Sequence, residues 1–256
     1  MPSDISENLA AFSDYAARFL QNHPESADSI TLKRDHSLRV LEYAQRIINS
    51  LGLGRTCAYT VSLAALFHDI GRYEQLVRYG TYNDHQSINH GLLGSRVLRS
   101  EDFLAGVPLE DRRLIIGAVM LHNRRTVPSM VTGKLHQTIS IIRDADKLDI
   151  MPVVINNIKN SNGRSSDVTL NLDPHPNKYT DSVYDAVMSN KMVHYETMHW
   201  VNDFKLALCG WVTDFNFTVS RQLLLKRGTL DELLHLLPET DNMKKLALHI
   251  KSILQQ

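Results

Sequence analysis

Helical periodicity runs through most of this chain of 256 residues, and alternating strand-like runs are scarce. Turn-forming residues interrupt the pattern most clearly over residues 156–166 and 173–177. We therefore expect an all-α protein. The predicted helices cover residues 5–21, 36–50, 57–68, 89–99, 109–122, 135–158, 183–192, 199–226, 230–237 and 242–254.

Two polar residues, His68 and Asp69, stand side by side directly after the apolar run Val61–Phe67. Burying an imidazole and a carboxylate without partners is unfavourable, and a bound metal ion would remove that penalty. The chain offers further candidate ligands at His36, His90, His122 and Asp146. Because this set contains nitrogen and carboxylate ligands and no cysteine, it predicts a divalent cation such as Fe, Mn, Ni, Co, Zn or Mg.

Helix starts are predicted beside two of these histidines. Asp35 can cap a helix that begins near His36, and Ser87 or Asn89 can cap one near His90. The side-chain oxygens of such residues accept the free amide protons of a first helical turn. Ligands at helix ends would converge on one point, which predicts a helical bundle with a polar centre.

The order and spacing of His36, the His68-Asp69 doublet and Asp146 resemble the HD-domain superfamily of metal-dependent phosphohydrolases. As in that family, His68-Asp-Ile-Gly71 follows a helix of small apolar residues, and Ala145-Asp-Lys-Leu148 is similar to the closing Ala-Asp-x-Leu motif. The resemblance implies an all-α HD-domain bundle in which His36, His68, Asp69 and Asp146 ligate a first metal. We interpret residues 1–256 as a single domain of this type, with a core over about 30–155 and a C-terminal helical extension over about 156–256.

A second carboxylate, Asp144, competes with Asp146 for the last ligand position. Apolar residues surround this segment on most sides, so periodicity does not separate the two. The register of the family motif favours Asp146, and Asp144 would then support a ligand or pair with a nearby cation.

His90 and His122 resemble the extra histidines of those HD subfamilies that hold two metals, in which the aspartate of the doublet bridges the ions. The resemblance thus implies one or two divalent metal ions as cofactor. The alternative is that each histidine is a hydrogen-bonded core residue. His85, in the polar segment Tyr82–Gln86, is either a further contributor or a solvated, substrate-facing residue.

Several cations flank the candidate ligands, namely Arg72, Arg124, Arg125 and Lys147. Arginine binds phosphate through its planar fork and lysine binds it as a point charge. Each of them alone is typical of a surface ion pair, but together they predict that at least one faces a phosphorylated substrate. Arg72, Arg124 and Arg125 are candidate substrate-binding residues. The candidate catalytic residues are Asp69, Lys147 and Glu74, the last as a general base or a support for a ligand.

Composition excludes several function classes. Lysine plus arginine and aspartate plus glutamate both number 28, so no charge excess indicates a dedicated nucleic-acid partner. The longest apolar stretch, Leu114–Leu121, is too short to span a membrane, and the N-terminus lacks the order of a signal peptide. Cys57 and Cys209 form no CxxC pair and are expected to be reduced, in agreement with a cytoplasmic protein. The oligomeric state is left open.

These features predict a metal-dependent hydrolase of phosphate esters, whose substrate is a small phosphorylated compound such as a nucleotide. A second enzyme class has the same ligand order, because HD-type mixed-valent di-iron oxygenases also use His, His-Asp, His, His and Asp. A non-catalytic, metal-containing ligand sensor or scaffold is the third hypothesis. Phosphate-binding loops and serine-hydrolase motifs are missing from the sequence, which disfavours ATP-driven transfer and serine hydrolysis.

Overall fold

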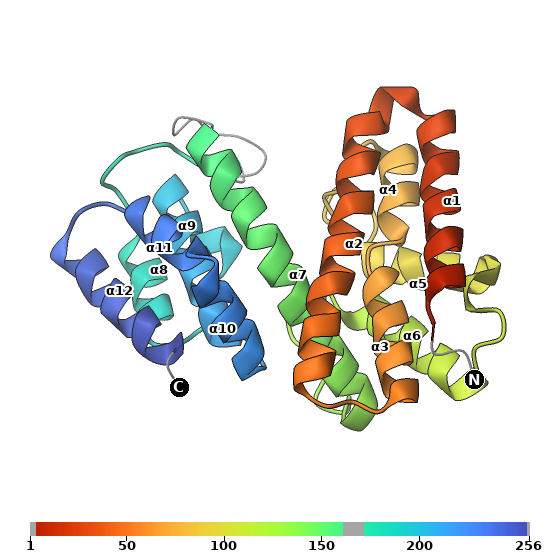
Figure 1. Ribbon diagram of the computed structural model, residues 1–256. Coiled ribbons are helices and arrows are strands. Elements are labelled where there is room, and N and C mark those ends of the chain that lie inside the picture. The colour runs from red at the N-terminus through yellow and green to blue at the C-terminus, as the bar shows by residue number, and fades with distance from the viewer. Residues whose placement is uncertain (1–3, 161–171, 255–256) are drawn as a thin grey trace. The chain divides into compact units, whose positions relative to one another are not determined.

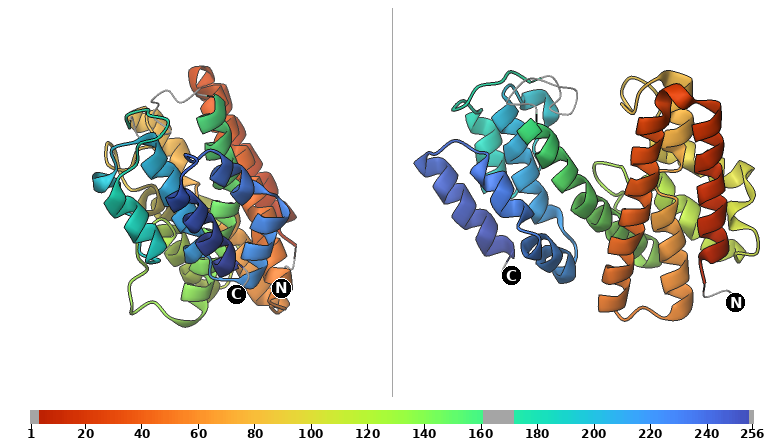
Figure 2. Two further views of the ribbon diagram at one scale, coloured as in Figure 1. Left: turned by 90° about the vertical axis from the view of Figure 1, so that its left-hand side faces the viewer. Right: turned by 45° about the horizontal axis from the view of Figure 1, so that its top comes forward.

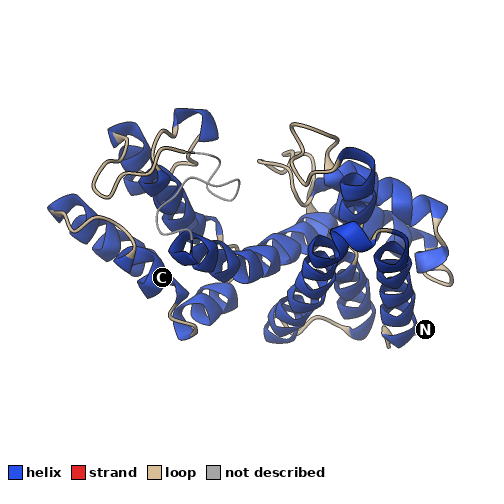
Figure 3. Ribbon diagram, turned by 90° about the horizontal axis from the view of Figure 1, so that it is seen from above, coloured by secondary structure: helices blue, strands red, loops and turns tan. Residues whose placement is uncertain are grey.

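The computed structural model of the protein describes residues 4–160 and 172–254 (Figure 1). Over these ranges the chain consists of helices and loops, and the only β-type pairing is an isolated bridge between Asp173 and Trp200 (Figure 3). The predicted all-α class is confirmed. None of the described helices is long and apolar enough to cross a membrane.

The chain divides into two compact units, residues 1–146 and residues 147–256. The division falls within helix α7 (Gly133–Asn160), nine residues before the boundary at about 155 that the sequence indicated. All six predicted metal ligands belong to the first unit.

The first unit is a helical bundle in which α2 packs on α3, α4 on α5, and α6 on both α3 and α5 (Figures 1 and 2). Helix α1 lies against α2 and α3. The helices are α1 (Ser6–Asn22), α2 (Ala27–Ser50), α3 (Arg55–Leu66), α4 (Gly71–Tyr79), α5 (His90–Ser100), α6 (Leu109–Leu121) and the first part of α7.

The second unit contains the rest of α7 and five further α-helices among its described residues. Here α9 packs on α8 and α11, and α10 packs on α11 and α12. These helices are α8 (Asp181–Met188), α9 (Val201–Gly210), α10 (Thr218–Lys226), α11 (Thr229–His235) and α12 (Asp241–Leu254).

The helix that carries His36 begins earlier than the sequence pattern indicated. Helix α2 starts at Ala27, so Asp35 lies inside it, and the Asp35 carboxylate pairs with Arg34 Nη2 at 2.8 Å. The prediction that Asp35 caps this helix is therefore wrong. The physical reason is Ile30, which is fully buried and extends the apolar face of α2 toward its N-terminus.

Helix α4 was not predicted, because its sequence Gly71-Arg-Tyr-Glu-Gln-Leu-Val-Arg-Tyr79 is largely polar. It forms because Tyr73 and Gln75 are buried in the bundle. By contrast, the predicted cap of α5 is confirmed, since the Asn89 side chain accepts a hydrogen bond from the Leu92 amide at 2.9 Å.

The helix predicted over residues 199–226 is broken in two. Helix α9 ends at Gly210, a short 3₁₀ helix covers Trp211–Asp214, and α10 begins at Thr218. The break occurs because Phe215, with an extended backbone conformation, is buried.

A cluster of aromatic rings fixes the end of α3, directly before the His68-Asp69 doublet. Phe67 is fully buried, and its ring centroid lies 5.1 Å from that of Phe103 and 6.2 Å from that of Phe12. Burying such a side chain contributes about 1.5–3 kcal/mol. The apolar core, rather than the polar residues themselves, therefore sets where the doublet lies.

Candidate metal centre

The His68-Asp69 doublet lies in a tight turn between two helices. Helix α3 ends at Leu66, residues 67–70 form the turn, and α4 begins at Gly71. The amide of Arg72 donates to the Asp69 carbonyl at 2.9 Å. Both side chains of the doublet are buried. The turn thus points two polar groups into the interior of the bundle.

Gly71 allows α4 to approach α5 closely. A Cβ atom at this position would lie 2.4 Å from both the Gly94 amide nitrogen and the His90 carbonyl oxygen. These are backbone atoms, so no side-chain rotation can relieve the clash. Glycine at this position therefore brings the doublet within reach of His90, the first residue of α5.

The two carboxylate oxygens of Asp69 face two different pairs of histidines. Asp69 Oδ2 lies 3.6 Å from His36 Nε2 and 3.8 Å from His68 Nε2. Asp69 Oδ1 lies 3.3 Å from His90 Nε2 and 3.9 Å from His122 Nε2. The described residues thus form two groups able to hold a metal ion, and Asp69 belongs to both.

Within each pair the two Nε2 atoms face one another. They are 3.3 Å apart between His36 and His68, and 3.3 Å apart between His90 and His122. Two nitrogens that ligate the same ion, each at about 2.1 Å from it, can have such a separation. The spacing therefore fits a divalent ion in each pair.

Backbone carbonyls determine which ring nitrogen carries the proton in two of these histidines. His68 Nδ1 lies 2.8 Å from the Ala65 carbonyl oxygen, and His122 Nδ1 lies 2.7 Å from that of Val119. A carbonyl can only accept, so Nδ1 donates, and Nε2 of the neutral ring presents a lone pair. A cation between the two facing nitrogens would satisfy such a lone pair, which is the second observation that fits metal.

The protonation states are those that metal ligation requires. Burial lowers the pKa of His68, and burial together with the charges of His90 and His68 lowers the pKa of His122 to about 3. Burial alone would raise the pKa of Asp69, but the positive charges around it, Lys33 foremost, hold that pKa well below its usual range. Neutral imidazoles and an ionised carboxylate result.

Asp146 extends the first histidine pair. Its Oδ1 atom lies 3.2 Å from His36 Nε2, and its side chain is 36% exposed. Burial would raise the pKa of Asp146, but the hydrogen bond and charge of His36 outweigh this effect and hold the pKa below its usual range. Asp144 is fully buried, and neither Asp144 nor Asp146 belongs to the two metal-capable groups among the described residues. The contact with His36 favours Asp146 as the ligand.

Comparison with known proteins agrees with this geometry. Residues 34–151 match the family model of the HD domain. This segment is an HD domain. The match spans all six predicted ligands, from His36 to Asp146, and HD domains bind divalent metal ions. The chain has no significant match among curated proteins or solved structures.

Lys33, one residue before the matched segment, contacts the candidate metal centre and was missed by sequence reasoning. Its Nζ atom donates to Asp69 Oδ2 at 2.8 Å, and its side chain is only 14% exposed. Lys33 precedes His36 by three residues and so shares a face of α2 with it. This signal was lost because the predicted helix started at His36.

Arg72 is the predicted cation that the structure brings to the centre. Its Nε atom lies 3.4 Å from Asp69 Oδ1 and is buried without a hydrogen-bond partner. The Tyr82 ring contacts both cations, with its centroid 5.5 Å from Lys33 Nζ and 5.8 Å from Arg72 Cζ. The two oxygens of Asp69 thus each have a cation beside them.

Asp84 is the second residue that sequence reasoning missed. Its Oδ1 and Oδ2 atoms lie 2.9 and 2.8 Å from His90 Nδ1, and it also accepts from Arg72 Nη1 at 3.2 Å and Gln75 Nε2 at 2.9 Å. Burial would raise the pKa of Asp84, but the hydrogen bond from His90 and neighbouring positive charge lower it to about 2. In the sequence Asp84 is one polar residue in a polar loop, and no periodicity distinguishes it.

Two other predicted residues, Glu74 and Lys147, have ion-pair partners that belong to neither metal-capable group of the described residues. Glu74 pairs with Arg78 Nη2 at 2.7 Å along α4 and belongs to neither metal-capable group of the described residues. Lys147 Nζ is held by the carboxylate and the carbonyl of Asp214, both in the second unit. Both side chains are thus engaged in ion pairs, and their catalytic roles stay predictions.

The remaining candidates are exposed at the surface, namely Arg124, Arg125 and His85. The carbonyl of Arg124 accepts a hydrogen bond from Arg143 on α7, which anchors the loop that follows His122. Proximity to His122 in the sequence therefore does not bury these side chains beside the metal ligands.

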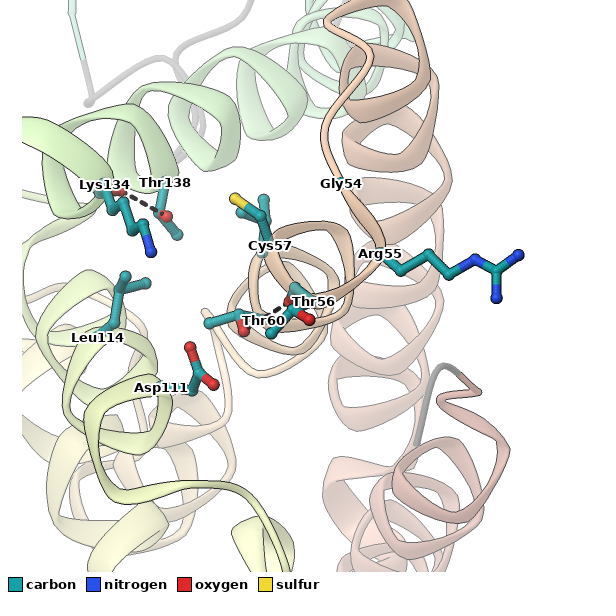
Figure 4. A pocket seen from close by; sticks show the side chains of 10 residues that line it. Gly54, Arg55, Thr56, Cys57, Thr60, Asp111, Leu114, Lys134 and Thr138 are labelled. Carbon is teal, nitrogen blue, oxygen red and sulfur yellow. Dashed lines mark hydrogen bonds between the residues drawn. The ribbon is translucent and has the colours of Figure 1, made fainter. Parts of the chain in front are cut away.

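A cavity of about 310 Å³ also lies in the first unit (Figure 4). It is formed by the start of α3 together with residues of α6 and α7, and its lining includes Thr56, Cys57, Thr60, Leu114, Lys134 and Thr138. None of the predicted ligands lines it. The histidine cluster is thus a separate feature of the same bundle.

Proposed function

We propose that this HD domain is a metal-dependent hydrolase of phosphate esters that acts on small phosphorylated compounds such as nucleotides. The observation that carries the proposal is the position of Asp69, whose two oxygens face separate histidine pairs at 3.3–3.9 Å. Such an arrangement suits two divalent ions bridged by one carboxylate.

The proposal assigns each ligand to one of two ions. The first would be held by His36, His68, Asp69 and Asp146, and the second by Asp69, His90 and His122. Bound divalent ions supply Lewis acidity toward a phosphoryl oxygen and lower the pKa of water to near neutrality.

The cations beside Asp69 are the residues that we assign to substrate. Lys33 and Arg72 flank its two oxygens, and the Tyr82 ring restrains both of them. When Asp69 is engaged in ligation, Lys33 and the buried Nε of Arg72 can donate to a phosphoryl oxygen instead. These two residues would orient the phosphate group and neutralise its charge.

The proposal is tested by phosphate release from protein stripped of metal and reloaded anaerobically with Mn²⁺ or Mg²⁺. The substrates would be a panel of nucleotides and sugar phosphates. We expect release that depends on added metal and is abolished in Asp69→Ala. Asp102→Asn changes an exposed carboxylate and serves as the matched control, with activity expected at the wild-type level.

A di-iron oxygenase is the second candidate, because four imidazoles and two carboxylates also form a suitable donor set for iron. Consumption of oxygen by the iron-loaded protein with a polyol or phosphonate, without any phosphate release, would support the oxygenase. Tight metal binding without turnover in either assay would support a non-catalytic sensor or scaffold.

A further inference from the structure

His90 differs from His68 and His122 in the group that holds its outer nitrogen. In the latter two, Nδ1 donates to a backbone carbonyl three residues earlier. In His90, Nδ1 lies 2.8–2.9 Å from both oxygens of Asp84, a carboxylate from the preceding loop. The orientation of His90 thus depends on a side chain that a substitution can remove.

The Asp84 carboxylate determines the tautomer of His90. A carboxylate accepts and does not donate, so the His90 proton is held on Nδ1. In the neutral ring, Nε2 then carries a lone pair. It points toward His122 Nε2, which is 3.3 Å away, and toward the second metal position. A metal ligand needs this free nitrogen.

A competing donor stands beside the same nitrogen. Asn123 Nδ2 lies 3.1 Å from His90 Nδ1 and 3.0 Å from Asp84 Oδ2, to which it donates. Without Asp84, the Asn123 amide can donate to Nδ1 of His90, which would move the ring proton to Nε2. His90 Nε2 would then donate to the Nε2 lone pair of His122, and the two rings would satisfy each other without a cation.

We infer that Asp84 is a positioning residue that keeps His90 in the tautomer able to bind the second metal. It does so by accepting one hydrogen bond from His90 Nδ1–H and another from the Asn123 amide. Asp84 also accepts from Arg72 and Gln75 on α4, so its own position is fixed by the helix that follows the His68-Asp69 doublet. This inference rests on the proposed function only in that His90 and His122 serve a second ion.

The first test reads the tautomer and requires neither metal nor turnover. In metal-free protein labelled with ¹⁵N-histidine, long-range ¹H–¹⁵N spectra distinguish protonated Nδ1 from protonated Nε2, and a His90→Gln variant assigns the resonances. We expect protonated Nδ1 in the wild type and protonated Nε2 in Asp84→Ala. His85→Ala alters an exposed residue of the same loop and should leave the wild-type pattern. A His90 ring that keeps its proton on Nδ1 in Asp84→Ala would overturn the inference.

The second test is calorimetric titration of the metal-free protein with Mn²⁺. Loss of a group that orients a metal-ligating histidine typically weakens metal binding about 10–100-fold. We expect this loss for one of two equivalents in Asp84→Ala, with the other unchanged and both unchanged in His85→Ala. If the alanine variant does not fold, Asp84→Leu keeps a side chain of similar shape without any acceptor and should show the same loss. Two equivalents of unaltered affinity in the folded variant would contradict the role of Asp84.

The two proposals fail separately. If no phosphate ester is hydrolysed but the tautomer and the second Mn²⁺ affinity change as expected, the proposed reaction is wrong and the role of Asp84 stands. If hydrolysis is found but both measurements are unchanged in Asp84→Ala, the reaction stands and the role of Asp84 is wrong.

Discussion

Replacing Gly71 by alanine tests how the two halves of the centre are held together. The added Cβ would lie 2.4 Å from the Gly94 nitrogen and the His90 oxygen, about 1 Å short of ordinary contact. Overpacking of this kind typically costs about 1–3 kcal/mol, and backbone neighbours place it near the upper end. The higher helix propensity of alanine offsets at most about 1 kcal/mol. We expect a net destabilisation of about 2 kcal/mol.

This loss of stability is measurable by thermal unfolding of the metal-free protein. For a chain of this size, 1 kcal/mol corresponds to about 2–4 °C, so Gly71→Ala should lower the melting temperature by about 4–8 °C. Gly54→Ala is the matched control, because no atom lies within 4 Å of its added Cβ. Since α5 begins with His90, separating α4 from α5 should also weaken binding of the second Mn²⁺. A Gly71→Ala variant that melts with Gly54→Ala and binds Mn²⁺ normally would refute this reasoning.

Three further predictions concern the ligands and their protonation. Asp146→Asn should reduce bound metal more than Asp144→Asn, because Asp146 contacts His36; elemental analysis checks this, and the reverse order would move the ligand by two positions. Metal-free protein should lose stability as the pH falls below about 6.5. The pKa of His122 is about 3 in the folded state and about 6.5 in the unfolded chain, so the unfolded chain binds more protons in this range and is favoured by acid. His122 alone accounts for about 2 kcal/mol between pH 7 and pH 5, and equal urea midpoints at the two pH values would contradict this sign. Lys147→Ala should lower stability modestly through loss of its pair with Asp214 and leave metal content unchanged; reduced metal content in a folded variant would return Lys147 to the centre.

The residues of the sequence determined the helical class and most of the chelating groups. Helical periodicity is a local property, so it is readable without tertiary contacts, and it placed α5 and α6 nearly at their observed bounds. The doublet His68-Asp69 follows an apolar run, where burial without partners would be unfavourable. The other histidines and carboxylates could then be compared with the ligand order of a known family.

Only the tertiary structure decided what surrounds those ligands. Lys33 lies in α2 and contacts Asp69 because burial of Ile30 makes this helix begin at Ala27. The polar residues before His36 had hidden this part of the helix from the periodicity analysis. Asp84 meets Asn123 across a separation of 39 residues, a contact that no spacing rule contains. Glu74, five residues after Asp69 in the sequence, has its carboxylate in an ion pair with Arg78. Local pattern identifies groups that can ligate a metal, but which groups support them depends on helix packing, because packing brings together side chains that are far apart in the sequence.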